Sequence, residues 1–159
     1  MGKTTLAVRW AHLARNRFPG GQLYVNLRGF DPDGIITADD AVRRFLSALG
    51  TPARDIPSDP EERCAFYRSR LAGSRVLLVL DNARDAAHVR PLLPGAASCQ
   101  VVVTSRNPLT GLVVAEGARP LVLGALDDTH SYAVIRFPSV DTPAFRPERK
   151  RNPCGAGRG

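Results

Sequence analysis

Residues 75–82 read Arg-Val-Leu-Leu-Val-Leu-Asp-Asn, an unbroken run of branched apolar residues that ends in two polar ones. A strand with one wet face alternates apolar and polar residues, whereas a continuous apolar run is typical of a strand covered on both faces. Strands of that kind belong to parallel sheets with helices on either side. The run therefore predicts a buried strand of an α/β fold.

Strand and helix signals alternate on both sides of this run. Gln100 to Thr104 is a second apolar strand, and two other segments are β-prone. Capping residues or apolar residues at helical spacing mark the segments between them. This alternation predicts an α/β sandwich with a parallel sheet and right-handed crossovers. The expected strands are residues 22–27, 75–80, 100–104 and 119–123, and the expected helices are residues 4–18, a segment capped by Thr37 to Leu49, a segment capped by Asp59 to Gly73, and residues 83–92 and 109–113.

The first expected helix is amphipathic. Its apolar residues recur at three- and four-residue steps with arginines opposite, and Pro19-Gly20-Gly21 ends it. We expect the apolar face to pack on the sheet. That face comprises Leu6, Ala7, Trp10, Leu13, Ala14 and Phe18.

The pattern changes after Leu126. Asp127-Asp128 predicts the cap of a sixth helix that runs through Ile135. Residues 137–159 then bring four prolines with no helical or strand period, and we expect them to be disordered. We therefore expect one folded domain over residues 1–126 and an irregular basic, Pro-rich tail over residues 127–159.

Composition places the chain among ordinary globular proteins, with 43% hydrophobic and 23% charged residues. No apolar run approaches the roughly 20 residues that span a bilayer, and no signal peptide opens the chain, so we expect a cytoplasmic protein without a membrane partner. Cys64, Cys99 and Cys154 lack metal-site spacing, which favours reduced thiols.

The net charge of +7 raises the question of nucleic-acid binding. Residues 141–159 hold five basic residues against two acidic ones, so the tail supplies +3 of this charge. The other arginines are scattered, with no aromatic residues interleaved as in single-strand binders. We therefore expect a solvated surface and no direct nucleic-acid binding. Only two of the 22 basic residues are lysines, which makes Lys3 conspicuous.

The chain opens Met-Gly-Lys-Thr-Thr directly before a helix, like the second half of a P-loop, Gly-x-x-x-x-Gly-Lys-[Ser/Thr]. In such a loop Gly2 lets backbone amides approach the phosphates, and Lys3 reaches the β- and γ-phosphates. Thr4 then serves as a Mg²⁺ ligand. The alternative is a chance tripeptide ahead of a helix capped by Thr4 or Thr5.

Two later residues fit the same chemistry. Asp81 ends the buried strand, where a Walker B carboxylate holds Mg²⁺ through water. The alternative is a turn or helix-cap residue. Arg106 follows the second apolar strand and suits a sensor that pairs with the γ-phosphate. Its alternative is a solvent-exposed arginine beside a Ser105 helix cap.

These motifs together resemble the NB-ARC class of STAND NTPases, and more narrowly the nucleotide-binding domains of actinobacterial antibiotic-regulatory transcription factors. The similar stretches are GKTTLAVRWAH, QLYVNLRGFDPDG, RVLLVLDNARDAAHVRPLLPG and VVVTSRNPLTGL, within residues 2–126. The resemblance implies a P-loop NTPase-like three-layer fold with a five-stranded parallel sheet, ADP bound at rest and ATP on activation. It also implies nucleotide contacts from Gly2, Lys3, Thr4, Thr5, Asp81 and Arg106.

The sequence also departs from that family. The first P-loop glycine and the strand leading into the loop would precede Met1, so we expect a sheet that lacks its first strand. We place the gap between the strands at 76–80 and 101–104. We also expect the chain to be marginally stable and to bind nucleotide weakly or not at all. Asn82 replaces a possible general base, which predicts slow or absent hydrolysis. The family's later adenine-contacting segments have no counterpart here.

The function that we expect is an ADP- or ATP-binding regulatory switch module of a STAND-type signalling or transcriptional regulator. In relatives the module lies between a DNA-binding effector domain and helical sensor repeats. One alternative is an inactive gene fragment of such a regulator. Another is a P-loop kinase, although residues 27–75 lack the basic, glycine-hinged character of a lid.

Overall fold

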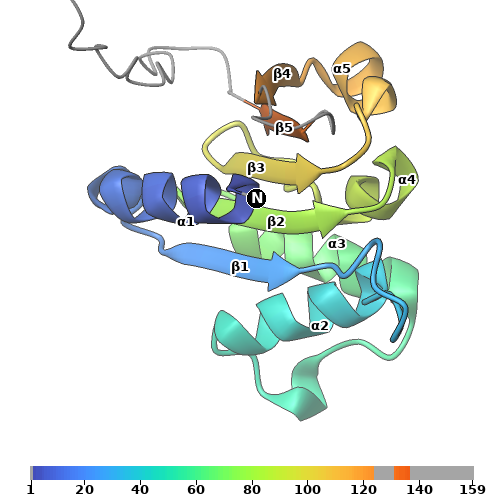
Figure 1. The fold of residues 1–159 in the computed structure, drawn as a ribbon. Coiled ribbons are helices and arrows are strands. Elements are labelled where there is room, and N and C mark those ends of the chain that lie inside the picture. The colour runs from blue at the N-terminus through green and yellow to red at the C-terminus, as the bar shows by residue number, and fades with distance from the viewer. Residues whose placement is uncertain (1, 124–130, 137–159) are drawn as a thin grey trace, which may run out of the picture.

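The computed structural model describes residues 2–123 and 131–136, which form an α/β fold around one five-stranded sheet in the order β1-β2-β3-β5-β4 (Figure 1). The strands β1 (Gln22–Asn26), β2 (Leu77–Ala83) and β3 (Gln100–Ser105) are adjacent and parallel. The α/β class and these three parallel strands are confirmed.

The strands β2 and β3 pair directly, so the gap that we expected between them is wrong. Leu78 lies opposite Val101, and Leu80 lies opposite Val103. Only the short helix α4 (Ala86–Val89) and the 3₁₀ turn η3 (Arg90–Leu92) separate these strands in the chain. Consecutive strands joined by so short a crossover usually become neighbours in the sheet.

The fifth strand makes the sheet mixed rather than wholly parallel. β5 (Ser131–Arg136) lies between β3 and β4 (Arg119–Leu123) and is antiparallel to both. The helix expected through Ile135 is therefore wrong. The segment reads Ser-Tyr-Ala-Val-Ile-Arg, whose aromatic and β-branched residues favour a strand when a neighbouring backbone is open for pairing. This strand lies beyond residue 126, where we placed the domain boundary, and residues 137–159 of the expected tail lie outside the described residues.

Helices cover the parallel strands on both faces, as the apolar runs predicted. The helix α1 (Lys3–Ala14), followed by the 3₁₀ turn η1 (Arg15–Arg17), crosses one face against Leu77, Val79 and Val102 (Figure 1). The other face, with Leu78, Leu80 and Val103, packs against the remaining helices. These are α2 (Ala38–Ala48), α3 (Pro60–Leu71), α4 and α5 (Thr110–Glu116), with a 3₁₀ turn η2 (Ala53–Asp55) between α2 and α3.

The face that α1 buries agrees with the expected one at Ala7 and Ala14 but not at Leu13. Ala7, Ala11 and Ala14 are buried against the sheet, whereas Leu13 is 77% exposed. Small residues at four- and three-residue steps let the helix backbone approach the sheet closely. Leu13, which we placed in the core, lies to the side of this alanine row. No described helix is long and apolar enough to cross a membrane.

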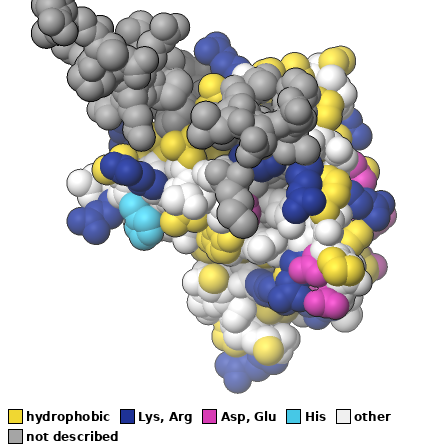
Figure 2. All heavy atoms as spheres, viewed as in Figure 1, with side chains coloured by type: hydrophobic (Ala, Val, Ile, Leu, Met, Phe, Trp, Pro, Cys, Tyr) yellow, Lys and Arg dark blue, Asp and Glu magenta, His cyan; other side chains and the backbone are white. Residues whose placement is uncertain are grey.

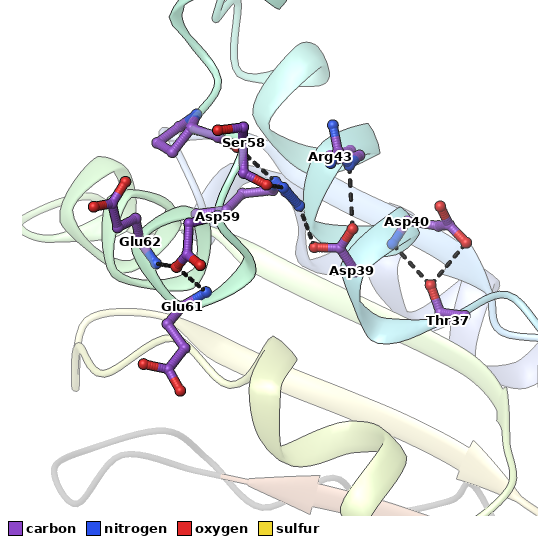
Figure 3. A network of polar contacts seen from close by, with 10 residues as sticks. Thr37, Asp39, Asp40, Arg43, Ser58, Asp59, Glu61 and Glu62 are labelled. Atoms are coloured by element: carbon purple, nitrogen blue, oxygen red, sulfur yellow. Dashed lines mark hydrogen bonds and ion pairs between the residues drawn. The ribbon is translucent and has the colours of Figure 1, made fainter.

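The caps expected for α2 and α3 are confirmed (Figure 3). The Thr37 hydroxyl accepts a hydrogen bond from the Asp40 amide at 3.1 Å. One Asp59 oxygen accepts from the amides of Glu61 and Glu62, both at 2.9 Å. Each cap satisfies amide groups that an isolated helix start leaves without a partner.

A buried arginine connects the starts of α2 and α3. Arg63 is 1% exposed, and its guanidinium donates to the carbonyls of Pro57 and Ser58 and to the carboxylate of Asp39. Burial alone would raise the pKa of Asp39, but hydrogen bonds from Arg63 and Arg43 hold that pKa below its ordinary value. The ion pair therefore links the N-terminal parts of the two helices.

Two of the three cysteines lie among the described residues. Cys64 is half-buried and Cys99 is buried, and both carry free thiols, as expected. Cys154 lies outside the described residues.

Candidate functional site

The helix α1 begins at the edge of the sheet where the parallel strands end. Gly2 is its N-cap, with φ of 146°, a conformation open to glycine and rarely to other residues. No side chain of the described residues caps this helix start, and Gly2 is its N-cap, so the alternative in which Thr4 or Thr5 is the cap is wrong. An uncapped helix start offers its first amide groups, and the positive end of its dipole, to an anion.

Thr4 connects this helix start to the buried carboxylate of Asp81. The Thr4 hydroxyl donates to Asp81 Oδ1 at 2.8 Å. Asp81 is 2% exposed and lies inside β2, and the cap of the following helix α4 is Asp85. Asp81 is therefore neither a turn residue nor a helix cap, and its carboxylate faces the start of α1.

Two further hydroxyl groups surround the same carboxylate. Thr104 Oγ1 donates to Asp81 Oδ1, and the Tyr24 hydroxyl lies 3.3 Å from Asp81 Oδ2. Burial and the negative charge of Asp81 raise the pKa of Tyr24, which keeps its hydroxyl protonated as a donor. Asp81 is thus held by three hydroxyl groups from α1, β1 and β3.

We predicted no role for Tyr24, and we predicted Thr104 only as the end of a strand. A usable signal is the two-residue period of strands. Tyr24 pairs with Val79, and Val79 pairs with Val102, on the face that α1 covers. Asp81 follows Val79 by two positions, and Thr104 follows Val102 by two positions. Both polar side chains therefore lie on the face that α1 covers.

Lys3 reaches across from α1 to the end of β3. Its Nζ donates to the Ser105 carbonyl at 3.1 Å. Partial burial lowers the pKa of Lys3, the positive charge of Arg106 lowers it further, and Asp81 opposes the shift. The positive charges of Lys3 and Arg106 repel each other. An anion bound between these two side chains would therefore be stabilised by both.

Arg106 follows β3, and its guanidinium lies over the ring of Phe30, with Cζ 5.3 Å from the ring centroid. The preceding Ser105 is not a helix cap, because its hydroxyl donates to the Ala83 carbonyl at 2.6 Å and accepts from the Asn107 amide. The helix α5 instead has Leu109 at its N-cap. Arg106 is solvent-exposed, and this exposure fits both a γ-phosphate sensor and the alternative of an ordinary surface arginine.

Asn82 has a backbone role that we did not predict. Its φ of 57° is left-handed, and the pairing of β2 with β3 shifts register between Leu80 and Ala83. Asparagine tolerates this conformation better than most residues. The Asn82 amide donates to Thr104 Oγ1 at 2.9 Å, which fixes the backbone directly after Asp81.

The structure thus brings together Lys3, Thr4 and Asp81, with Gly2 at the helix cap and Arg106 near Lys3. Thr5 is exposed on α1, and no hydrogen bond among the described residues joins it to this cluster.

The donor set can be compared with what Mg²⁺ requires. Mg²⁺ is usually held by one or two carboxylates together with waters and substrate phosphates. The Asp81 carboxylate and the Thr4 hydroxyl supply oxygens of that kind at adjacent positions. Within residues 2–123 and 131–136, no group of three or more His, Cys, Asp or Glu side chains could hold a metal ion. These residues therefore fit a Mg²⁺ ion that is also bound by a phosphate. They do not fit a site in which protein side chains supply all the ligands.

Basic side chains are spread apart on the face that Figure 2 shows. On the part of the face in Figure 2 that grey atoms do not cover, Lys and Arg side chains occur at separate places, some beside acidic ones. Several arginines have a carboxylate within 4.0 Å, for example Arg43 with Asp39 and Arg84 with Asp85.

Comparison with known proteins relates this α/β chain to bacterial regulatory proteins. The regulatory protein AfsR of Streptomyces coelicolor strain ATCC BAA-471 / A3(2) / M145 is 52% identical over 117 residues. AfsR of Streptomyces griseus is 50% identical over 117 residues. Each alignment covers 70% of this chain and 11% of the relative, so the chain spans about a tenth of the length of these proteins. No protein-family model matches the chain, and no solved structure matches it.

Proposed function

We propose that this chain is an adenine-nucleotide-binding module of a transcriptional regulator, with a P-loop NTPase fold of the NB-ARC and STAND type. The observation that carries the proposal is the cluster of Lys3, Thr4 and Asp81 at an uncapped helix start. A cation, a hydroxyl and a buried carboxylate at the carboxyl edge of parallel strands suit a phosphate with its Mg²⁺. The AfsR relatives, which are named as regulatory proteins, support the regulatory part.

Each residue has a definite task in this proposal. The amides that follow Gly2 receive phosphate oxygens, and Lys3 exchanges the Ser105 carbonyl for the β- and γ-phosphates. Thr4 and Asp81 would hold Mg²⁺, Thr4 as a ligand and Asp81 through water. Mg²⁺ neutralises the phosphate charge. Arg106 pairs with the γ-phosphate, which only ATP carries.

A regulatory switch requires that its ADP-bound and ATP-bound states both last long, and it does not require rapid ATP hydrolysis. Asn82 cannot accept a proton, so hydrolysis is slow or absent. In a longer regulator, ADP and ATP would then bias the module toward different contacts with a DNA-binding effector domain and helical sensor repeats. A cytoplasmic location is part of this proposal, because such a regulator acts on the chromosome.

A titration of the ¹⁵N-labelled 159-residue chain with Mg-ADP tests the proposal, because NMR detects even weak binding. We expect chemical-shift changes at the amides of residues 2–6 and 105–107. Lys3→Ala should remove most of the affinity, whereas Arg9→Ala, which removes an exposed cation from the same helix, should leave it unchanged. Equal affinity in the Lys3→Ala variant and the unaltered chain would reject the phosphate site.

A further inference from the structure

The segment after β1 returns to the edge of the sheet and lies against the backbone that follows Asp81. The Leu27 amide donates to the Asp81 carbonyl, and the Gly29 amide donates to the Asn82 carbonyl, both at 2.8 Å. These bonds extend the pairing of β1 with β2 into the connecting loop. These bonds therefore hold the backbone that leads into Phe30 next to the candidate site.

Gly29 shows how closely the two backbones approach. A Cβ atom at this position would lie 2.4 Å from the Arg84 amide nitrogen and 2.6 Å from the Asn82 carbonyl oxygen. Both neighbours are backbone atoms, which cannot move aside as a flexible side chain can. Glycine at position 29 thus allows a contact that no other residue would permit.

The backbone after β3 is fixed to the same place. The Ser105 hydroxyl donates to the Ala83 carbonyl at 2.6 Å, and the Asn107 side chain donates to the Arg84 carbonyl at 2.7 Å. Arg106 lies between these two anchors. Phe30 and Arg106 thus extend from two loops that are both attached to residues 82–84.

We infer that Phe30 is a positioning residue for Arg106: its ring supports the guanidinium beside Lys3 in an orientation that pairs with the γ-phosphate of ATP. This inference rests on the proposed nucleotide site. A free arginine side chain has several rotatable bonds, and ordering it on binding costs conformational entropy. A guanidinium above a ring keeps its in-plane N–H groups available, so the ring restrains the side chain without competing for the phosphate.

Phe30 therefore affects discrimination between nucleotides and does not itself touch phosphate. Phe30→Leu should weaken binding of Mg-ATP about two- to fivefold, the effect of losing a partly exposed cation–π contact, and leave Mg-ADP binding unchanged. Phe30→Tyr, which keeps the ring, should bind both nucleotides as the unaltered chain does. Ile35→Ala, which shortens an exposed apolar side chain in the same loop, is the matched control.

A double-mutant cycle measured by nucleotide titration of the 159-residue chain tests the inference. In the Arg106→Ala background, Phe30→Leu should no longer change the ratio of ATP to ADP affinity. If Phe30→Leu fails to fold, as circular dichroism would reveal, Phe30→Met removes the ring and replaces it with a flexible, unbranched side chain that adapts to the space left. If a folded variant without the ring binds both nucleotides with an unchanged ratio of ATP to ADP affinity, the role of Phe30 is overturned and the proposed nucleotide site is not. Absence of binding by either nucleotide to the unaltered chain overturns the proposed function and this inference together.

Discussion

The Thr4 hydroxyl donates to Asp81 Oδ1 at 2.8 Å across 77 positions of sequence. This bond attaches the start of α1 to the end of the buried strand β2. In the proposed site the same two oxygens would hold Mg²⁺, and their direct hydrogen bond would then be replaced by contacts to the ion and its waters. Asp81 keeps its hydrogen bonds from Thr104 and Tyr24 meanwhile, which hold the carboxylate in place.

The Mg²⁺ dependence of nucleotide binding should therefore depend on Asp81. Mg²⁺ should increase the affinity for ADP, and we expect this increase to be about 10- to 100-fold smaller in Asp81→Asn. That factor is the usual cost of losing an outer-shell partner of a metal. ADP binding without Mg²⁺ should change little. Calorimetric titrations with Mg²⁺ and with a chelator measure both quantities. Asp33→Asn, in an exposed turn, is the control, and an undiminished Mg²⁺ effect in Asp81→Asn would exclude the assigned role.

Arg106 should distinguish ATP from ADP. We expect Arg106→Ala to weaken ATP binding by about 1.5–3 kcal/mol, the usual contribution of a hydrogen bond to a charged group, and barely to change ADP binding. Arg84→Ala removes another exposed arginine at the same edge of the sheet and should affect neither nucleotide. Equal losses for ATP and ADP in Arg106→Ala would mean that Arg106 has only a structural role.

Turnover should be slow, with phosphate release far below a typical enzyme rate of about 10 per second. Asn82→Asp supplies a carboxylate while tolerating the left-handed φ of 57°, so it should raise phosphate release without loss of folding. A coupled phosphate assay on both chains measures the difference. Rapid release by the unaltered chain would instead place it among enzymes.

The sequence predicted much of the fold, because its strongest signals are local. The apolar runs around Leu78 and Val102 identified β2 and β3, and the caps at Thr37 and Asp59 fixed the starts of two helices. Spacing alone could not decide which face of α1 is buried. Leu13 fits the apolar stripe, yet the closest packing on the sheet uses Ala11 instead.

The remaining errors concern non-local pairing. The order of strands depends on which backbones meet, and a segment such as Ser131–Arg136 becomes a strand only when β3 and β4 offer partners. The site was predicted in part: Lys3, Thr4 and Asp81 meet in the structure. Tyr24 and Phe30 were missed because their roles depend on neighbours that are remote in sequence.

The ion pair of Asp39 with buried Arg63 should make stability depend on pH (Figure 3). Hydrogen bonds from Arg63 and Arg43 outweigh the effect of burial and hold the pKa of Asp39 below its ordinary value of 3.8. A depressed carboxyl pKa contributes stability above the unfolded-state pKa, and that contribution is lost as the pH falls through the folded-state pKa. The contribution is therefore complete near neutral pH and fades below about pH 4.

Replacing Asp39 by Asn should reveal this dependence. We expect Asp39→Asn to lower the free energy of unfolding by about 1–3 kcal/mol at neutral pH, because Arg63 stays buried with carbonyl partners but no counter-charge. The difference from the unaltered chain should shrink in acid, as the pH falls through the lowered folded-state pKa of Asp39 and its carboxyl takes up a proton. Urea unfolding at a series of pH values measures it. Asp55→Asn is the control, because among the described residues Asp55 pairs only with the exposed Arg54. A difference that stays constant from neutral to acid pH would show that Asp39 acts through its shape and not through its charge.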